Sequence, residues 1–203
     1  GTSLEIFALT LLGAIPLGVL IVLGRLSRFR PLSLLMQLLI SVMRGTPLML
    51  QMFAVFFVPF YVFGIQTGTD YMFTAVIIAF VINYAAYFAE IFRAGIQSVD
   101  RGQYEAAQSL GMSYGQTMRR VVLPQMVRHI LPPMSNEAIT LVKDTSLIYV
   151  LALNDLLRAA RNLVQRDFTV TPFIVAAGFY LVMTAVLTWA FQRMERHYAR
   201  QDL

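Results

Sequence analysis

The chain has 203 residues, of which 58% are hydrophobic and only 13% are charged, whereas an ordinary globular domain has about 25% charged residues. Its apolar residues form long runs instead of one-sided helical stripes, which excludes an ordinary soluble fold and indicates lipid as the solvent. The net charge is +5. The chain contains no cysteine, so disulfides and thiolate metal sites are excluded as well.

Five segments are long and apolar enough to cross a membrane, since a span needs about 20 residues. We expect these spans at about residues 6–27, 31–63, 71–97, 130–152 and 170–192 of a single transmembrane domain that covers residues 1–203. The second span contains Arg44-Gly45-Thr46-Pro47, where glycine and proline together predict a helix kink. The chain starts without methionine, and its first span lacks a basic leader and a cleavage site, so we expect a missing native N-terminus and no signal peptide.

Arginines are concentrated in three regions that five spans would place on the same side of the membrane. These are the first connection, the long connection after the third span and the C-terminal tail, with Arg25, Arg28, Arg30, Arg101, Arg119, Arg120, Arg128, Arg193, Arg196 and Arg200. The positive-inside rule makes that side cytoplasmic. Arg158, Arg161 and Arg166 lie on the opposite side and weaken the bias without reversing it.

The polar connection between the third and fourth spans contains a predicted helical hairpin at residues 100–124. Asp100 with Gln103, and Ser113 with Gln116, have the spacing of N-terminal helix caps. Gly111 lies between them and can adopt the left-handed conformation that ends a helix. We therefore expect two short helices that meet at Gly111, with Pro124 closing the second. An amphipathic hairpin that lies on lipid headgroups is the alternative interpretation.

The same hairpin contains a spaced pattern of residues. Glu-Ala-Ala at 105–107 is followed after three residues by Gly111, after nine more by the branched aliphatic Val121, and after one more by Leu-Pro at 123–124. This spacing resembles the cytoplasmic signature of the permease subunits of bacterial ATP-binding cassette (ABC) importers, with valine at position 121 where isoleucine is more usual. The resemblance implies a coupling helix that docks in an ATPase subunit. The coupling residues it implies are Tyr104, Glu105, Ala106, Ala107, Ser109, Gly111, Leu123 and Pro124.

Three further stretches, at 44–48, 89–96 and 131–147, resemble the polar amino acid branch of these permeases. The resemblance implies an all-α membrane protein with five transmembrane helices in the bacterial cytoplasmic (inner) membrane, and a polar amino acid as substrate, with glutamate, aspartate and glutamine as candidates. It also implies three kinds of partner: a second permease chain, identical or homologous; two ATP-binding subunits, which hold ATP and Mg; and a periplasmic or lipid-anchored solute-binding protein.

Polar residues within the third and fourth spans are candidates for the substrate path. A charged residue at the centre of a membrane costs about 2.5–3.5 kcal/mol, so such residues usually face a bundle interior or a solute path. The candidates are Asn83, Tyr87, Asn136, Glu137, Thr140, Lys143, Asp144 and Thr145. Asp144 or Glu137 would hold the ammonium group of an amino acid, and Lys143, Asn83, Thr140 or Thr145 its carboxylate. The alternative is a structural interaction of Lys143 with Asp144 or Glu137 at a dimer interface.

The sequence contains no phosphate-binding loop, zinc-protease helix or nucleophile elbow. We therefore expect a transport subunit that is not an enzyme and that binds no metal, cofactor or nucleic acid. Glu90 and Arg93, three residues apart, are expected to form an ion pair. An ion-coupled secondary amino acid transporter, in which Asp144 and Glu137 carry protons, is the alternative function.

Overall fold

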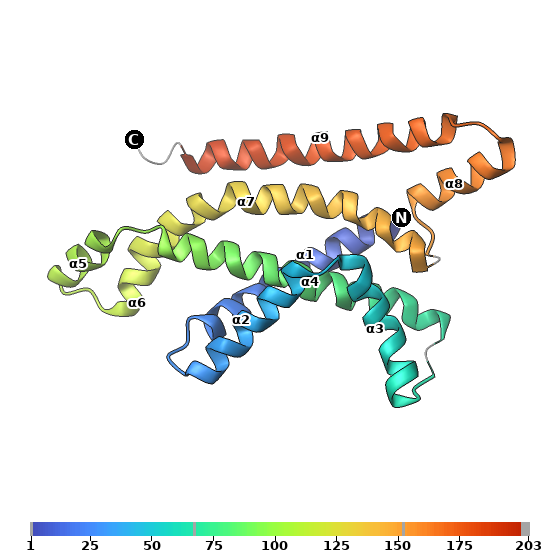
Figure 1. The fold of residues 1–203 in the computed structure, drawn as a ribbon. Coiled ribbons are helices and arrows are strands. Elements are labelled where there is room, and N and C mark those ends of the chain that lie inside the picture. The colour runs from blue at the N-terminus through green and yellow to red at the C-terminus, as the bar shows by residue number, and fades with distance from the viewer. Residues whose placement is uncertain (1, 67, 152, 200–203) are drawn as a thin grey trace.

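The structure is a computed structural model, and it describes residues 2–66, 68–151 and 153–199, which are helical with short connections (Figure 1). The helices are α1 (Thr2–Arg25), α2 (Arg30–Gly45), α3 (Leu48–Phe63), α4 (Thr69–Gln97), α5 (Arg101–Ser109), α6 (Tyr114–Thr117), η1 (Met118–Val122), α7 (Leu123–Asp144), η2 (Thr145–Leu151), α8 (Leu156–Asp167) and α9 (Thr171–Ala199). Of these, η1 is a π-helix and η2 is a 3-10 helix.

The long helices α1 and α4 form the centre of the bundle, and α4 also packs against α2, α3 and α7. Gly18 allows α1 to approach α4 closely, because a Cβ atom there would lie 3.1 Å from the carbonyl oxygen of Ala85. The face of α4 is lined with buried alanines at positions 75, 79, 85, 86 and 89. Small residues at helix contacts are typical of membrane bundles, where close packing replaces the hydrophobic drive that water provides.

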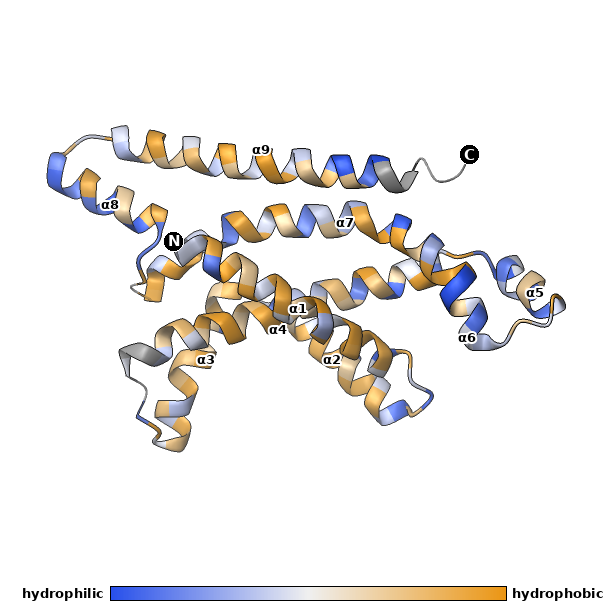
Figure 2. Cartoon of the chain, turned by 180° about the vertical axis from the view of Figure 1, so that it is seen from behind, coloured by the Kyte–Doolittle hydropathy of each residue, from blue (hydrophilic) through white to orange (hydrophobic). Residues whose placement is uncertain are grey.

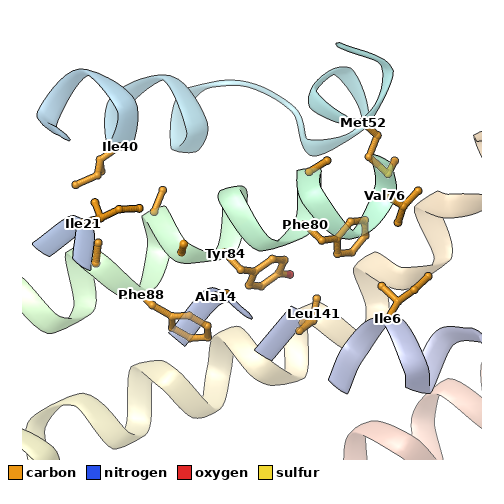
Figure 3. Close-up of a cluster of buried hydrophobic side chains, with 14 of the residues drawn as sticks. Ile6, Ala14, Ile21, Ile40, Met52, Val76, Phe80, Tyr84, Phe88 and Leu141 are labelled. Atoms are coloured by element: carbon orange, nitrogen blue, oxygen red, sulfur yellow. The ribbon is translucent and has the colours of Figure 1, made fainter. Parts of the chain in front are cut away.

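Large side chains fill the space between α1, α4 and α7 (Figure 3). Phe80, Tyr84 and Phe88 follow one another at intervals of four residues on α4, and adjacent ring centroids are 6.3 Å and 6.4 Å apart. Ile6 of α1 and Leu141 of α7 are fully buried in the same cluster. This packing holds α7 against the central helix pair.

Within the described residues, three helical stretches are long and apolar enough to cross a membrane: Thr2–Arg25, Tyr71–Gln97 and Thr171–Arg196. The bent pair α2 and α3 makes a fourth if it counts as one span. Figure 2 shows the apolar character of these helices and the more hydrophilic α5–α6 region. By composition alone α7 is not among the candidates, and it carries four charged residues, Arg128, Glu137, Lys143 and Asp144. The count of five spans therefore stays a prediction.

The helix kink predicted at residues 44–47 is a complete break. Helix α2 ends at Gly45, α3 begins at Leu48, and the two helices are bent by 111°. Thr46 and Pro47 between them have extended backbone conformations. Proline has no N–H group and disfavours helical geometry in the residue before it, which explains why the helix stops here.

The fourth predicted span differs in its boundaries from the helix that forms. Helix α7 begins at Leu123 and passes at Thr145 into η2, while the predicted end at residue 152 lies outside the described residues. The prediction that Pro124 closes the second hairpin helix is wrong, because α6, η1 and α7 follow one another without a break. In η1 the N–H group of Leu123 donates to the carbonyl oxygen of Met118, and this wider π turn relieves the clash of a proline ring with the preceding turn.

The arginine-rich connections lie together in space. The α1–α2 connection, the α5–α6 hairpin and the C-terminal part of α9 are at one end of the molecule, and the N-terminus, the α3–α4 connection and α8 are at the other (Figure 1). This arrangement agrees with the prediction that these three regions share one side of the membrane, while Arg158, Arg161 and Arg166 of α8 lie at the opposite end.

Candidate functional site

The hairpin at residues 100–124 has the predicted caps. The Asp100 carboxylate accepts a hydrogen bond of 2.6 Å from the N–H group of Gly102 at the start of α5. Ser113 and Gln116 form a reciprocal capping box at the start of α6, in which the N–H group of Ser113 donates to Gln116 Oε1 at 2.8 Å. Both helix starts are therefore stabilised by side chains a few residues away in the chain.

Gly111 forms the corner between the two helices in the predicted left-handed conformation, with φ of 72°. The N–H groups of Gly111 and Met112 donate to the carbonyl oxygens of Gln108 and Ala107 at 2.9 Å and 3.1 Å. This pair of bonds is the Schellman motif that ends many helices. A Cβ atom at Gly111 would meet nothing within 4 Å, so the backbone conformation, and not space, favours glycine.

The predicted coupling residues divide into exposed and packed ones. Glu105, Ala106 and Ser109 on α5, and Leu123 and Pro124 at the start of α7, are exposed, whereas Ala107 is buried in the hairpin. Burial and the neighbouring Tyr114 raise the pKa of the half-buried Tyr104, so its phenol stays neutral. Only one of the two alanines is therefore available to another surface.

Two residues of this surface were missed from the sequence. Leu110 and Tyr114 flank the Gly111 corner and are 81% and 77% exposed. Large apolar side chains that project from a polar hairpin are typical of contact residues in interfaces. The sequence signal that could have identified them is their position on either side of a glycine predicted to be left-handed.

A buried polar network closes the break between α2 and α3. The Asn83 side-chain amide of α4 donates to the carbonyl oxygen of Met43 at 3.0 Å and to Gln51 Oε1 at 2.9 Å. The Gln51 amide in turn donates to the carbonyl oxygens of Met43 and Thr46 at 2.9 Å and 3.1 Å. These bonds satisfy carbonyl groups that a continuous helix would have paired, as membrane depth requires.

Asn83 is thus placed in this network, and its predicted role as a substrate contact stays a prediction. Gln51 was missed by the sequence analysis. The signal that could have found it is a lone amide within a long apolar run, because a buried polar group must have a partner.

The charged residues of α7 have different surroundings. Tyr84 of α4 donates a hydrogen bond of 2.8 Å to the carboxylate of Asp144. No salt bridge joins Lys143 to Asp144 or Glu137 within residues 2–66, 68–151 and 153–199, and the alternative of such an interaction at a dimer interface stays a prediction. Asn136, Thr140 and Lys143 form an exposed stripe, and the Thr145 hydroxyl is buried and bonded to the carbonyl oxygen of Val142.

An open cavity of about 350 Å³ lies between the end of α2, the second half of α4 and the central part of α7. This volume is at the lower end of the range for small-molecule sites. Its polar and charged lining consists of Arg44, Tyr87, Glu90, Ser98, His129 and Glu137. Of the predicted path residues, the cavity therefore brings together Tyr87 and Glu137, and the others do not line it.

The expected ion pair of Glu90 and Arg93 is confirmed, with Arg93 Nε at 3.0 Å from Glu90 Oε1. Glu90 lines the cavity, but its charge is already balanced on its own helix. Glu137 forms no salt bridge in the part of the chain that the structure describes, and its charge interacts across the cavity with that of Arg44. The free charges of the cavity therefore lie on α2 and α7.

Comparison with known proteins adds an independent observation. The profile of the family described as binding-protein-dependent transport system inner membrane component matches residues 14–200. The arginine transport system permease protein ArtQ of Bacillus subtilis (strain 168) is 36% identical over 201 residues, which cover 98% of this chain and 90% of ArtQ. The glutamate/aspartate import permease protein GltK of Escherichia coli O157:H7 is 38% identical over 172 residues, which cover 82% of this chain and 77% of GltK.

Solved structures agree with the arrangement of the helices. A chain from the crystal structure of an amino acid ABC transporter with histidines is 36% identical and superposes with a TM-score of 0.87, covering 96% of this chain and 90% of that one. A chain of the MetNI methionine ABC transporter in an inward facing conformation is 16% identical, with a TM-score of 0.74 and coverage of 97% and 91%. The second likeness concerns the fold alone.

Proposed function

This chain belongs to the family of binding-protein-dependent transport system inner membrane components and is an amino-acid ABC transporter permease, and from that premise we propose how it conducts its substrate. The substrate is a polar amino acid, which crosses the bacterial cytoplasmic membrane through the cavity between α2, α4 and α7. The single observation that carries this proposal is the cavity itself, which has the half-buried Glu137 on one wall.

Glu137 is the residue that would receive the ammonium group of the amino acid. It is the predicted acidic path residue that lines the cavity, whereas Asp144 is engaged by Tyr84 and lies outside the lining. A carboxylate at membrane depth that faces an open cavity is typical of a solute path. Tyr87 lies on the opposite wall and adds an aromatic face.

The hairpin at residues 100–124 is the part of the chain that would couple ATP hydrolysis to transport. Permeases of this family work with ATPase subunits, and the exposed Leu110 and Tyr114 beside Gly111 give such a subunit a contact surface. The hairpin joins α4 directly to α7, because α6 and η1 lead into α7 without a break. A displacement of the hairpin would therefore move the two helices that carry most of the cavity lining.

The assembly we propose contains a second permease chain, two ATP-binding subunits and a solute-binding protein outside the membrane. ATP and Mg belong to the ATP-binding subunits, and this chain acts without catalysis of its own. The exposed stripe of Asn136, Thr140 and Lys143 on α7 would face the second permease chain, since none of these side chains is buried by its own helices. Nucleic acid has no part in the proposal, because the arginines gather at the ends of membrane helices.

Transport by purified components separates this function from the secondary-transporter alternative. The permease is reconstituted into vesicles with its ATPase subunits and its solute-binding protein, and uptake of radiolabelled glutamine, glutamate and arginine is measured. We expect accumulation that requires ATP and the ATPase subunits. Accumulation driven by an ion gradient without those subunits would contradict the proposal.

Replacing Glu137 tests the ammonium site in the same vesicles. A hydrogen bond to a charged group contributes about 1.5–3 kcal/mol, so Glu137→Gln is expected to reduce uptake at low substrate concentration by roughly 10-fold or more. Glu5→Gln, at an exposed position in the first turn of α1, is the matched control and should transport normally. Equal uptake by the two variants would remove Glu137 from the path.

A further inference from the structure

We propose that Arg44 is the residue that binds the carboxylate of the transported amino acid, and that α4 positions it through Asn83 and Tyr87. The inference rests on the proposed function, because it assigns the second charged end of the same substrate. Arg44 lies in the last turn of α2, directly before the helix break, and its side chain lines the cavity. The sequence associates this residue with a helix kink and with a stretch that resembles the polar amino acid branch, and not with the substrate path.

The guanidinium of Arg44 is available to an anion. In residues 2–66, 68–151 and 153–199, no salt bridge or hydrogen bond joins it to an acidic side chain. Glu90, an acidic residue of the same cavity, is held by Arg93 on its own helix. The Arg44 side chain is exposed in the single chain, and its charge interacts with those of Glu90 and Glu137 without a direct salt bridge to either among the described residues. A cation without a direct partner at membrane depth is costly, so a position beside an open cavity indicates a ligand that supplies the counter-charge.

Arg44 and Glu137 give the cavity two charges of opposite sign on different walls. Arg44 comes from α2 and Glu137 from α7, both side chains line the cavity, and no direct salt bridge joins them among the described residues. The main-chain groups of an amino acid carry the complementary pair, a carboxylate and an ammonium. A planar guanidinium can donate two parallel hydrogen bonds to a carboxylate, which a lysine ammonium cannot match.

The orientation of Arg44 is set at two points by a single face of α4. Its guanidinium carbon lies 5.2 Å from the centroid of the Tyr87 ring, the geometry of a cation–π contact. Four residues earlier on α4, and therefore on the same face, the Asn83 amide donates to the carbonyl oxygen of Met43, the residue before Arg44. Helix α4 thus holds both the main chain next to Arg44 and its side chain.

Lys143, one of the four residues that the sequence offers for the carboxylate, has none of these features. It is exposed, as Arg44 is, but it lies near the C-terminal end of α7 and does not line the cavity. Arg44 and Lys143 therefore make opposite predictions for one experiment.

The test measures binding to the purified permease with its ATPase subunits and without the solute-binding protein, whose selectivity would mask that of the permease. The probes are radiolabelled L-arginine with its decarboxylated form agmatine, and L-glutamate with its decarboxylated form 4-aminobutyrate. We expect Arg44→Gln to weaken amino acid binding at least tenfold and to change binding of the decarboxylated forms less than twofold. Asn83→Leu should show the same pattern with a smaller loss. Arg30→Gln, an exposed position in the first turn of α2, is the matched control and should bind like wild type.

The outcomes distinguish this inference from the proposed function. Wild-type protein that binds no probe and transports none would overturn both. Wild-type binding with Arg44→Gln unchanged, or weakened equally for acids and decarboxylated forms, would overturn the carboxylate assignment and leave the permease function intact. A loss in Lys143→Gln instead of Arg44→Gln would move the carboxylate site to α7. If Arg44→Gln does not assemble, Arg44→Lys replaces it, and wild-type affinity for the amino acids in that variant would contradict a two-bond guanidinium site.

Discussion

The coupling hairpin and the polar cavity are built in opposite ways. In the hairpin, Asp100, Ser113 and Gly111 are stabilised by bonds to residues at most a few positions away. In the cavity, Arg44 is oriented by Asn83 and Tyr87, which lie two helices further along the chain. The comparison shows that the conformation of the hairpin is specified by residues close together in the sequence. The arrangement of the cavity lining depends instead on how the helices pack.

The two regions are nevertheless parts of one mechanical unit. Helix α4 runs from Tyr87 to the hairpin, and α7 runs from the hairpin to Glu137. A hairpin that moves as a rigid corner would change the separation of the cavity walls. Substitutions in each region should therefore have different signatures: loss of coupling in the hairpin, and loss of solute binding in the cavity.

The largest expected effect is at Gly111. A residue with a side chain pays about 1–2 kcal/mol in the left-handed conformation, which lowers the population of the native corner by roughly 5–30-fold. Gly111→Val should therefore abolish most uptake while ATP hydrolysis by the assembled complex continues, and the measurement is the ratio of solute transported to ATP hydrolysed. Gly111→Asn is the matched control, because asparagine tolerates this conformation. An equal ratio in the two variants would show that the corner conformation does not matter for coupling.

A smaller effect is expected from Gln51, which closes the helix break beside the cavity. Gln51→Leu leaves the carbonyl oxygens of Met43 and Thr46, whose hydrogen bonds are partly buried, with fewer donors, at a cost of about 2 kcal/mol. We expect a lower melting temperature of the complex and weaker amino acid binding, with the transport-to-ATP ratio for bound substrate unchanged. Gln37→Leu, at an exposed position on α2, is the control and should change neither the melting temperature nor amino acid binding. A lower transport-to-ATP ratio in Gln51→Leu would contradict the assignment of coupling to the hairpin and of binding to the cavity.

The smallest effect concerns the α1–α4 contact that both regions share. In Gly18→Ala the new methyl group would lie 3.0–3.3 Å from atoms of Phe88, Ala85 and Ala89, so the helices must separate slightly, at a cost of about 1 kcal/mol. Gly178→Ala on α9 meets nothing within 4 Å and should be neutral or slightly stabilising. Thermal unfolding in detergent compares the two variants. A higher melting temperature in Gly18→Ala than in Gly178→Ala would contradict the close packing.

Much of the hairpin could be predicted from the sequence. The caps, the left-handed glycine and the Glu90–Arg93 pair depend on residues three or four positions apart, and such contacts follow from helix geometry alone. Prediction failed at Pro124, because the chain forms a π turn there and continues into α7. The burial of Ala107 could not be predicted, because the face that α5 buries depends on what it packs against.

The sequence by itself determined the membrane class, the approximate apolar segments, the hairpin with its glycine corner and the family. Only the tertiary structure decided that α2 and α3 are bent by 111° and that Asn83 and Gln51 close this break. It also decided that Arg44 and Glu137 line the same cavity whereas Lys143 does not. The reason is physical: hydrogen bonds within a helical turn are specified by a few neighbouring residues, whereas the partners of a buried amide or guanidinium depend on the relative positions of whole helices.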